Sequence, residues 1–326
     1  MLTRPDRGDQ FRSRGSIPFV YVASDLQPAG DNPRTSAGTR EIEGLSVSPG
    51  GGTVPARQRR YRIRVVTDAG ADLPASLAEA LGIRIVHGAV HFGTELWQGS
   101  EQEFWEAVRR GGPAPSTSPP TAAALAEAFS GAEFVCSIHV SAELSRTVEH
   151  AKEAAAGAES VHVVDTRSLS VGTGLVAVAA AEAAELNTGF HQVKALVRRL
   201  VDQAHVYAVI EDVSFLIRGG RAGLIGSSAK PGSRQVLAVR GHAIPLGHAR
   251  DRPGAIRELL HHVAGHGGHS VDRWAVGHGD ADDAEDFVGR ARRQLGRAPS
   301  FVVPLGPAVG THAGPGALIL GVLEAG

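Results

Sequence analysis

The chain is almost free of cysteine. Of its 326 residues only Cys136 carries a thiol, so an intrachain disulfide and a cysteine-ligated zinc site are both excluded. Cys136 lies in an apolar run, where a buried structural thiol is expected rather than a reactive one. This use of cysteine is typical of a protein from a reducing compartment.

An excess of charge and a long hydrophobic run are also missing. Lys and Arg number 33 and Asp and Glu 34, which gives a net charge of -1 at pH 7 and argues against nucleic acid or an anionic membrane surface as a partner. The longest apolar helical stretch, 175–181, is too short to span a bilayer. The amino-terminal residues lack the pattern of a signal peptide. We therefore expect a cytoplasmic protein with no integral membrane segment and no nucleic-acid partner.

Two kinds of catalytic motif are absent as well. No Gly-Lys-Ser/Thr sequence occurs, which excludes a P-loop, and no Gly-x-Ser-x-Gly elbow marks a serine hydrolase. Gly172-Thr173-Gly174, with Ala177 at the third position of a dinucleotide fingerprint, leaves an NAD-dependent or other nucleotide-binding enzyme as an alternative, although no acidic residue ends a following strand. The histidines around His262 and His278 leave a metal-binding protein as a second alternative, although their spacing defines no site.

The chain does contain a regular alternation of strand-like and helix-like segments after a different beginning. Residues 1–60 are dominated by Arg, Gly, Ser, Pro and Asp, so we expect a disordered or extended segment there. Over 61–204 the alternation is typical of βαβ units on a parallel sheet. The predicted strands are 64–66, 83–90, 134–140 and 161–164, and the predicted helices are 75–81, 102–110, 121–129, 145–156, 175–186 and 190–203.

A second α/β unit is predicted over 205–326, and a chain of 326 residues is long enough for two domains. Its predicted strands are 206–210, 235–239, 243–247, 274–277 and 301–303, and its predicted helices are 212–218, 253–264 and 281–295. In an open α/β sheet, ligands bind beyond the carboxyl ends of the strands. The hydroxyl-bearing loops that follow the predicted strands are therefore candidate anion sites.

The segment 305–317 contains a single histidine, His312, among six Gly and Pro residues. It lies between the predicted strand 301–303 and the apolar run 318–320, so we expect a loop that is held at both ends. Glycine permits close approach of the backbone, and histidine can donate a hydrogen bond to an anion. The segment predicts a loop that presents an imidazole to a ligand.

Seven motifs, including the segment 305–317, resemble the signatures of the DegV family and occur in the same order. Members of this family are bacterial two-domain proteins that bind a fatty acid and present its carboxylate to a kinase partner. The motifs are residues 67–74, 116–120, 140–147, 164–166, 172–174, 219–221 and 305–317. The resemblance implies an α/β fold with an N-terminal parallel sheet domain, a C-terminal domain with a mixed sheet, and the ligand between them. It also implies a lipid-binding subunit without a cofactor, whose partners are a long-chain fatty acid and the catalytic subunit of a fatty acid kinase.

The resemblance also assigns roles to individual residues. Thr117 and Ser141 stand where the family supplies hydroxyls to the carboxylate. His312 stands where the family has a histidine that donates to the carboxylate, and Arg221 where it has an arginine that supports this network. The supporting loop positions are Asp68, Ser118, Ser145, Gly310, Thr311 and Gly314. For Ser118 and Ser145 the local pattern favours the capping of helices. No catalytic residue and no metal ligand is implied.

Overall fold

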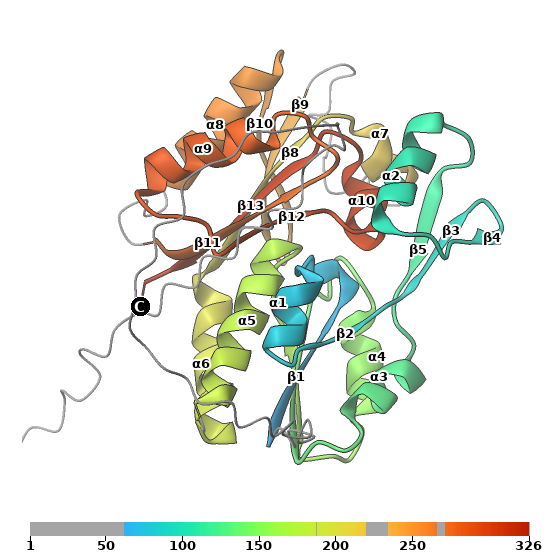
Figure 1. The fold of residues 1–326 in the computed structure, drawn as a ribbon, viewed down its shortest axis with the longest axis vertical. Coiled ribbons are helices and arrows are strands. Elements are labelled where there is room, and N and C mark those ends of the chain that lie inside the picture. The colour runs from blue at the N-terminus through green and yellow to red at the C-terminus, as the bar shows by residue number, and fades with distance from the viewer. Residues whose placement is uncertain (1–61, 187, 220–233, 266–270, 326) are drawn as a thin grey trace, which may run out of the picture.

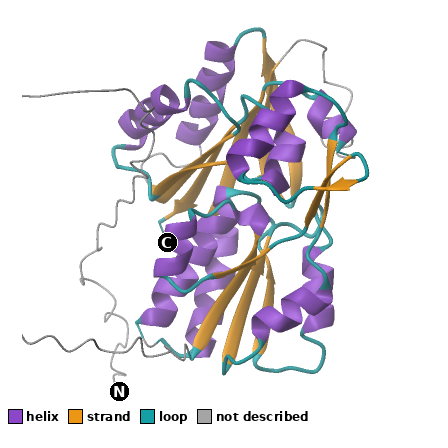
Figure 2. Ribbon diagram, turned by 45° about the vertical axis from the view of Figure 1, so that its right-hand side comes forward, coloured by secondary structure: helices purple, strands orange, loops and turns teal. Residues whose placement is uncertain are grey.

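The structure is a computed structural model that describes residues 62–186, 188–219, 234–265 and 271–325. Figures 1 and 2 show a parallel sheet in the lower half of the molecule and a larger mixed sheet in the upper half. This confirms the predicted α/β class and the predicted kinds of sheet. The predicted segment 1–60 lies outside the described residues.

The parallel sheet has the strand order β2-β1-β6-β7. Its strands are β1 (Ile63–Asp68), β2 (Arg84–Val86), β6 (Phe134–His139) and β7 (Val161–Asp165). Successive side chains of a strand point to opposite faces, so Val66 and Val135 pack under two helices on one face while Val65 and Cys136 join the core on the other. The helices of this half are α1 (Ala75–Ala80), α3 (Ala122–Phe129), α4 (Thr147–Ala154), α5 (Val171–Glu185) and α6 (Phe190–Gln203).

The single strand predicted over 83–90 is wrong, because this stretch forms two strands in different sheets. After β2, the strand β3 (Ala89–Phe92) pairs with β4 (Glu95–Leu96) and β5 (Pro115–Ser118) in a small antiparallel sheet. The break includes Gly88, where an added Cβ would clash with the carbonyl oxygen of Ser118, and such a close approach requires glycine. Helix α2 (Glu101–Arg110) lies beside this sheet (Figure 1).

The mixed sheet has the order β10-β9-β8-β13-β11-β12, and only β11 and β12 run parallel. Its strands are β8 (Ala204–Ile210), β9 (Arg234–Arg240), β10 (His242–Ala249), β11 (Val271–His278), β12 (Phe301–Pro304) and β13 (Leu318–Glu324). Helices α8 (Arg252–Gly265) and α9 (Ala284–Leu295) cover one face through a separate apolar core. Gly241 turns the β9–β10 hairpin with φ 82°, as predicted, since glycine adopts positive φ at little cost.

Helix α5 packs against strands of both large sheets (Figures 1 and 2). Its first turn carries the glycines of the possible dinucleotide fingerprint. A Cβ on Gly321 of β13 would lie 2.9 Å from the nitrogen of Gly172, and a Cβ on Gly174 would lie 2.6 Å from the carbonyl oxygen of Ala71. These glycines therefore permit α5 to pack closely against both halves of the protein, which accounts for them without a bound nucleotide. Helix α5 contributes to one apolar core that spans both sheets. The domain boundary predicted between residues 204 and 205 therefore stays a prediction.

Two local predictions at the candidate site are also wrong. The expected loop around His312 is a helix, α10 (Pro307–Ala313), which begins after Gly306 with a proline in its first turn and ends at Gly314 with φ 75°. Proline at the start and glycine at the end delimit a helix, so the residues that suggested a loop are its boundaries.

The second wrong prediction is that Ser118 caps a helix. Helix α3 is capped by Thr121, whose hydroxyl accepts a hydrogen bond from the nitrogen of Ala124 at 3.2 Å, whereas the exposed Ser118 ends β5.

Within the described residues, none of the helices combines the length and the apolar character that crossing a bilayer requires.

Candidate functional site

Thr117 and His312 lie together although 195 positions separate them in the chain. The Thr117 hydroxyl, on β5, is 3.0 Å from Nε2 of His312, on α10. Both side chains are partly buried. The structure therefore brings together a hydroxyl from the amino-terminal half and an imidazole from the carboxyl-terminal half, as the DegV-like motifs implied.

Gly219, at the end of α7 (Ser214–Arg218), also contributes to this site. A Cβ at Gly219 would collide with Nδ1 of His312, so the absence of a side chain lets the backbone lie directly against the ring. Gly219 is the first residue of the predicted Gly-Gly-Arg motif. Arg221, the candidate cation of that motif, lies outside the described residues.

The three supporting positions on and after α10 each have a packing role. Gly310 receives the aromatic rings of α2, because an added Cβ would lie 2.8 Å from Cζ2 of Trp105. Gly314 ends the helix with φ 75° and fits against the ring of Phe215. Thr311 is 2% exposed, so it faces the interior while its neighbour His312 faces Thr117. Together these contacts orient His312.

Ser141 is placed differently from Thr117. Its hydroxyl is fully buried, donates to the carbonyl oxygen of Gly241 and accepts from the nitrogen of Glu143 at 3.2 Å. The nitrogen of Gly241 in turn donates to the carbonyl oxygen of Arg167 at 2.6 Å. The loops after β6 and β7 thus hold the β9–β10 turn, and Ser141 connects the two sheets. Ser145, in the same loop, accepts from the nitrogen of Thr147 at 3.3 Å at the start of α4.

Asp68 belongs to a buried chain of hydrogen bonds that the sequence did not reveal. Its Oδ2 lies 2.8 Å from Nδ1 of His139, whose Nε2 lies 2.6 Å from the hydroxyl of Ser137. The order Ser, His, Asp resembles a catalytic triad, but Ser137 and His139 are both 0% exposed, so a substrate has no access to the hydroxyl. These hydrogen bonds join the ends of β1 and β6 and support the loop that carries Ser141. The alternation of Ser137 and His139 along β6 was the one available signal.

Asp72 has a structural role that the sequence analysis did not predict. It is 6% exposed, accepts from the Ser170 hydroxyl at 2.6 Å and accepts from the nitrogen of Gly306 at 3.0 Å. Burial, with a smaller contribution from the nearby Glu101 carboxylate, raises the pKa of Asp72 to about 8. Burial also raises the pKa of Glu101 to about 7. Asp72 therefore connects the first loop of the parallel sheet to the residue directly before α10.

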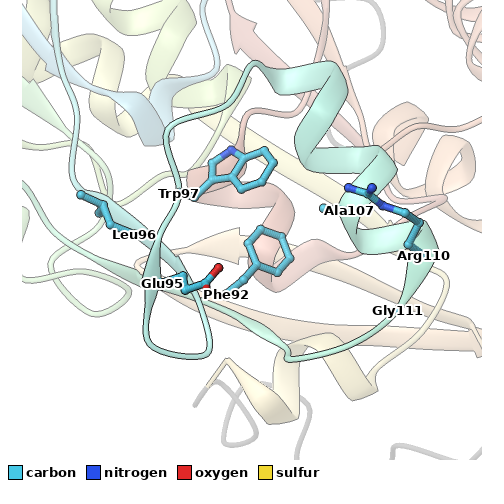
Figure 3. A pocket seen from close by; sticks show the side chains of 7 residues that line it. All are labelled: Phe92, Glu95, Leu96, Trp97, Ala107, Arg110 and Gly111. Atoms are coloured by element: carbon cyan, nitrogen blue, oxygen red, sulfur yellow. The ribbon is translucent and has the colours of Figure 1, made fainter.

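A surface hollow of about 340 Å³ lies between the β3–β4 hairpin and α2 (Figure 3). The rings of Phe92 and Trp97 meet edge to face there, with centroids 5.2 Å apart, and Arg110 lies on the opposite, helical side. Phe104 continues this contact inward to Trp105, with centroids 5.1 Å apart, and both rings reach Gly310. The hollow is thus joined to α10 by aromatic packing.

The histidine-rich alternative gains no support from the geometry. Among the described residues, no three or more His, Cys, Asp or Glu side chains are grouped so that they would hold a metal ion. His261 and His262 are neighbours on α8 with ring centroids 6.1 Å apart. His266 and His269 lie outside the described residues.

Known proteins resemble this chain over most of its length. The family model described as "Uncharacterised protein, DegV family" matches residues 62–325. A DegV domain-containing protein of Deinococcus radiodurans is 33% identical over 277 residues, which are 78% of this chain and 96% of that protein. One of Streptomyces coelicolor is 34% identical over 280 residues, with 80% and 97% covered.

Solved structures are similar as well. A DegV family protein from Thermus thermophilus, described by its fatty acid binding, superposes with a TM-score of 0.71 at 29% identity and covers 81% of this chain and 99% of its own. DegV from Bacillus subtilis, described as a fatty acid binding protein, superposes with a TM-score of 0.70 at 26% identity and covers 80% and 99%.

Proposed function

The chain belongs to the DegV family, and on that premise we propose that it binds a long-chain fatty acid whose carboxylate is received by Thr117 and His312. The observation that carries the proposal is the 3.0 Å contact between the Thr117 hydroxyl and Nε2 of His312. In the structure these two groups bond to each other. A carboxylate has two oxygens that accept only, so it can take a hydrogen bond from each group.

The chemistry of the pair suits an anion better than a neutral ligand. A bond to a carboxylate is charge-assisted and stronger than a neutral one, and a protonated imidazole adds the attraction of opposite charges. Partial burial reduces the competition from water. The relatives from Thermus thermophilus and Bacillus subtilis are described as binding fatty acids, which supports a lipid acid as the ligand.

We assign the other two predicted ligands to supporting roles. Ser141 would reach a carboxylate only after its hydroxyl leaves the carbonyl oxygen of Gly241, so we place it behind the site, where it holds the two sheets together. Arg221 follows Gly219 by two positions, and we propose that its guanidinium supports the charge of the carboxylate. The acyl chain is proposed to lie between the two halves.

We propose further that the bound carboxylate is presented to a separate kinase subunit, which forms the acyl phosphate. The partial exposure of Thr117 and His312 leaves the carboxylate within reach of a partner. The chain contains no P-loop sequence, which supports a role as the binding subunit rather than the phosphorylating one.

Native mass spectrometry of the protein purified from cells tests the binding. We expect a mass increase that matches a long-chain fatty acid and disappears after delipidation. The delipidated protein should then bind palmitic acid more tightly than methyl palmitate, since the ester keeps the tail and removes the charge. Equal affinity for the acid and the ester would refute a carboxylate-reading site.

A further inference from the structure

We propose that Trp105 is a positioning residue for His312, so that α2 determines how the imidazole meets the carboxylate. This inference rests on the proposed function and adds to it a residue that does not touch the ligand. Trp105 is 3% exposed and lies on α2, in the same half of the molecule as Thr117. It therefore links the segment that carries Thr117 to the helix that carries His312.

The first observation is a hydrogen bond at the entrance to α10. The indole N–H of Trp105 donates to the carbonyl oxygen of Leu305 at 3.0 Å. Asp72 accepts from the nitrogen of the next residue, Gly306, at 3.0 Å. Two buried side chains of the amino-terminal half thus hold both polar groups of the peptide that joins Leu305 to Gly306, and this peptide leads into the helix that carries His312.

The second observation is direct packing against the helix. The Trp105 ring lies so close to Gly310 that a Cβ at this position would be 2.8 Å from Cζ2. Gly310 precedes His312 by two positions. The same ring also approaches Gly279, where a Cβ would be 3.2 Å from Cη2. Trp105 therefore contacts α10 at its entrance and at its middle.

The length of α10 makes these contacts decisive. A helix of seven residues has little stability of its own in water, so packing determines where it lies. If the indole N–H is removed, the buried carbonyl of Leu305 loses a partner, and it can regain one only through a shift of the backbone or an entering water. Either change moves the start of α10. A charge-assisted hydrogen bond depends on distance and angle, so recognition of the carboxylate should suffer more than contact with the tail.

The test is Trp105→Phe, which keeps an aromatic ring and removes the N–H. Trp274→Phe is the matched control, because Trp274 is 0% exposed and its indole donates to the carbonyl oxygen of Arg297 at 3.2 Å, within the separate core under α8 and α9. We would measure dissociation constants of palmitic acid and methyl palmitate by displacement of a fluorescent fatty acid, together with the melting temperature.

For Trp105→Phe we expect acid binding to weaken on the order of tenfold while ester binding stays within about twofold of wild type. Trp274→Phe should lower the melting temperature by a similar amount and leave the ratio of acid to ester affinity unchanged. A wild-type ratio in Trp105→Phe would overturn the positioning role and leave the proposed function standing. Wild-type protein that does not distinguish acid from ester would overturn both.

Gly310→Ala tests the same contact should Trp105→Phe fail to fold. The added methyl group pushes against the Trp105 ring and leaves the N–H in place. We expect it to lower the ratio of acid to ester affinity as well. An altered ring-proton shift of His312 in the NMR spectrum of either variant would show that the imidazole has moved, and an unchanged shift would contradict the inference.

Discussion

Replacement of His312 by alanine is the most direct test of the carboxylate site. The imidazole is partly buried and its Nε2 lies 3.0 Å from the Thr117 hydroxyl, so the bound carboxylate should take one charge-assisted hydrogen bond from it. Removing such a bond costs about 1.5–3 kcal/mol. Because each 1.4 kcal/mol corresponds to about tenfold in affinity, we expect His312→Ala to raise the dissociation constant of palmitic acid roughly tenfold to a hundredfold. The partial exposure of the ring favours the lower part of this range.

Thr117→Val tests how much the Thr117 hydroxyl contributes to the affinity for palmitic acid. Valine keeps the shape of threonine and suits a strand, so the change removes the hydroxyl and little else. Water can partly replace a hydroxyl, and the expected cost is therefore smaller, about 0.5–1.5 kcal/mol or roughly twofold to tenfold in affinity. Neither variant should change the binding of methyl palmitate by as much.

The assay is displacement of a fluorescent fatty acid by the acid and by the ester, at one salt concentration. His248→Ala is the control, because His248 is exposed on β10. The reasoning is refuted if His312→Ala binds palmitic acid as tightly as wild type does, or if it loses acid and ester affinity equally. In either case a generic apolar pocket would explain the binding better than a carboxylate site.

Three further predictions concern the rest of the chain. Burial raises the pKa of Asp72 from 3.8 to about 8, so between about pH 4 and pH 8 the folded protein holds a proton that the unfolded chain has lost. The free energy of unfolding should therefore fall as the pH rises from about 4 to 8. Asp72→Asn should reduce this dependence of the unfolding free energy on pH, measured by denaturant titrations at several pH values. A slope unchanged by the substitution would show that Asp72 is already ionised at neutral pH. Burial raises the pKa of the Cys136 thiol to about 12, so a thiol reagent should modify it only in denaturant, and rapid labelling of the native protein would contradict its burial. Deletion of residues 1–60 should leave the melting temperature nearly unchanged, because their composition favours no packed core, whereas a large decrease would show that they pack against the remainder.

Elements with clear periodicity were predicted well from the sequence. The strands at 134–140 and 161–164 and the helix at 190–203 agree with β6, β7 and α6 to within one residue at each end, because their apolar residues repeat with the period of a strand or a helix. The small sheet was missed for a physical reason. Strand β4 has two residues, too few to show any alternation, and β3 and β5 are defined by their pairing with each other.

The candidate site was predicted in part. The motifs predicted Thr117 and His312 as ligands, and the structure places these two side chains 3.0 Å apart. The loop predicted around His312 is wrong, because the proline and glycines of this segment mark the start and the end of a short helix. The hydrogen-bond partners of the other residues could not be predicted from the sequence. Ser141 donates to Gly241, 100 positions away, and Asp72 accepts from Gly306, 234 positions away. Contacts of this kind depend on how the two halves pack, which a local pattern does not contain.

Close packing between segments that are far apart in the chain holds the proposed carboxylate site together. Gly172 of α5 lies against Gly321 of β13, and a larger side chain at either position would force the sheets apart. Thr117 of β5 meets His312 of α10 in a similar way, and a displacement of either element would lengthen the 3.0 Å contact between the two side chains. On the proposed function, a carboxylate that bonds to both groups binds only the arrangement in which they are close. It must then stabilise that arrangement by mass action, and a methyl ester, which offers weaker acceptors, must stabilise it less.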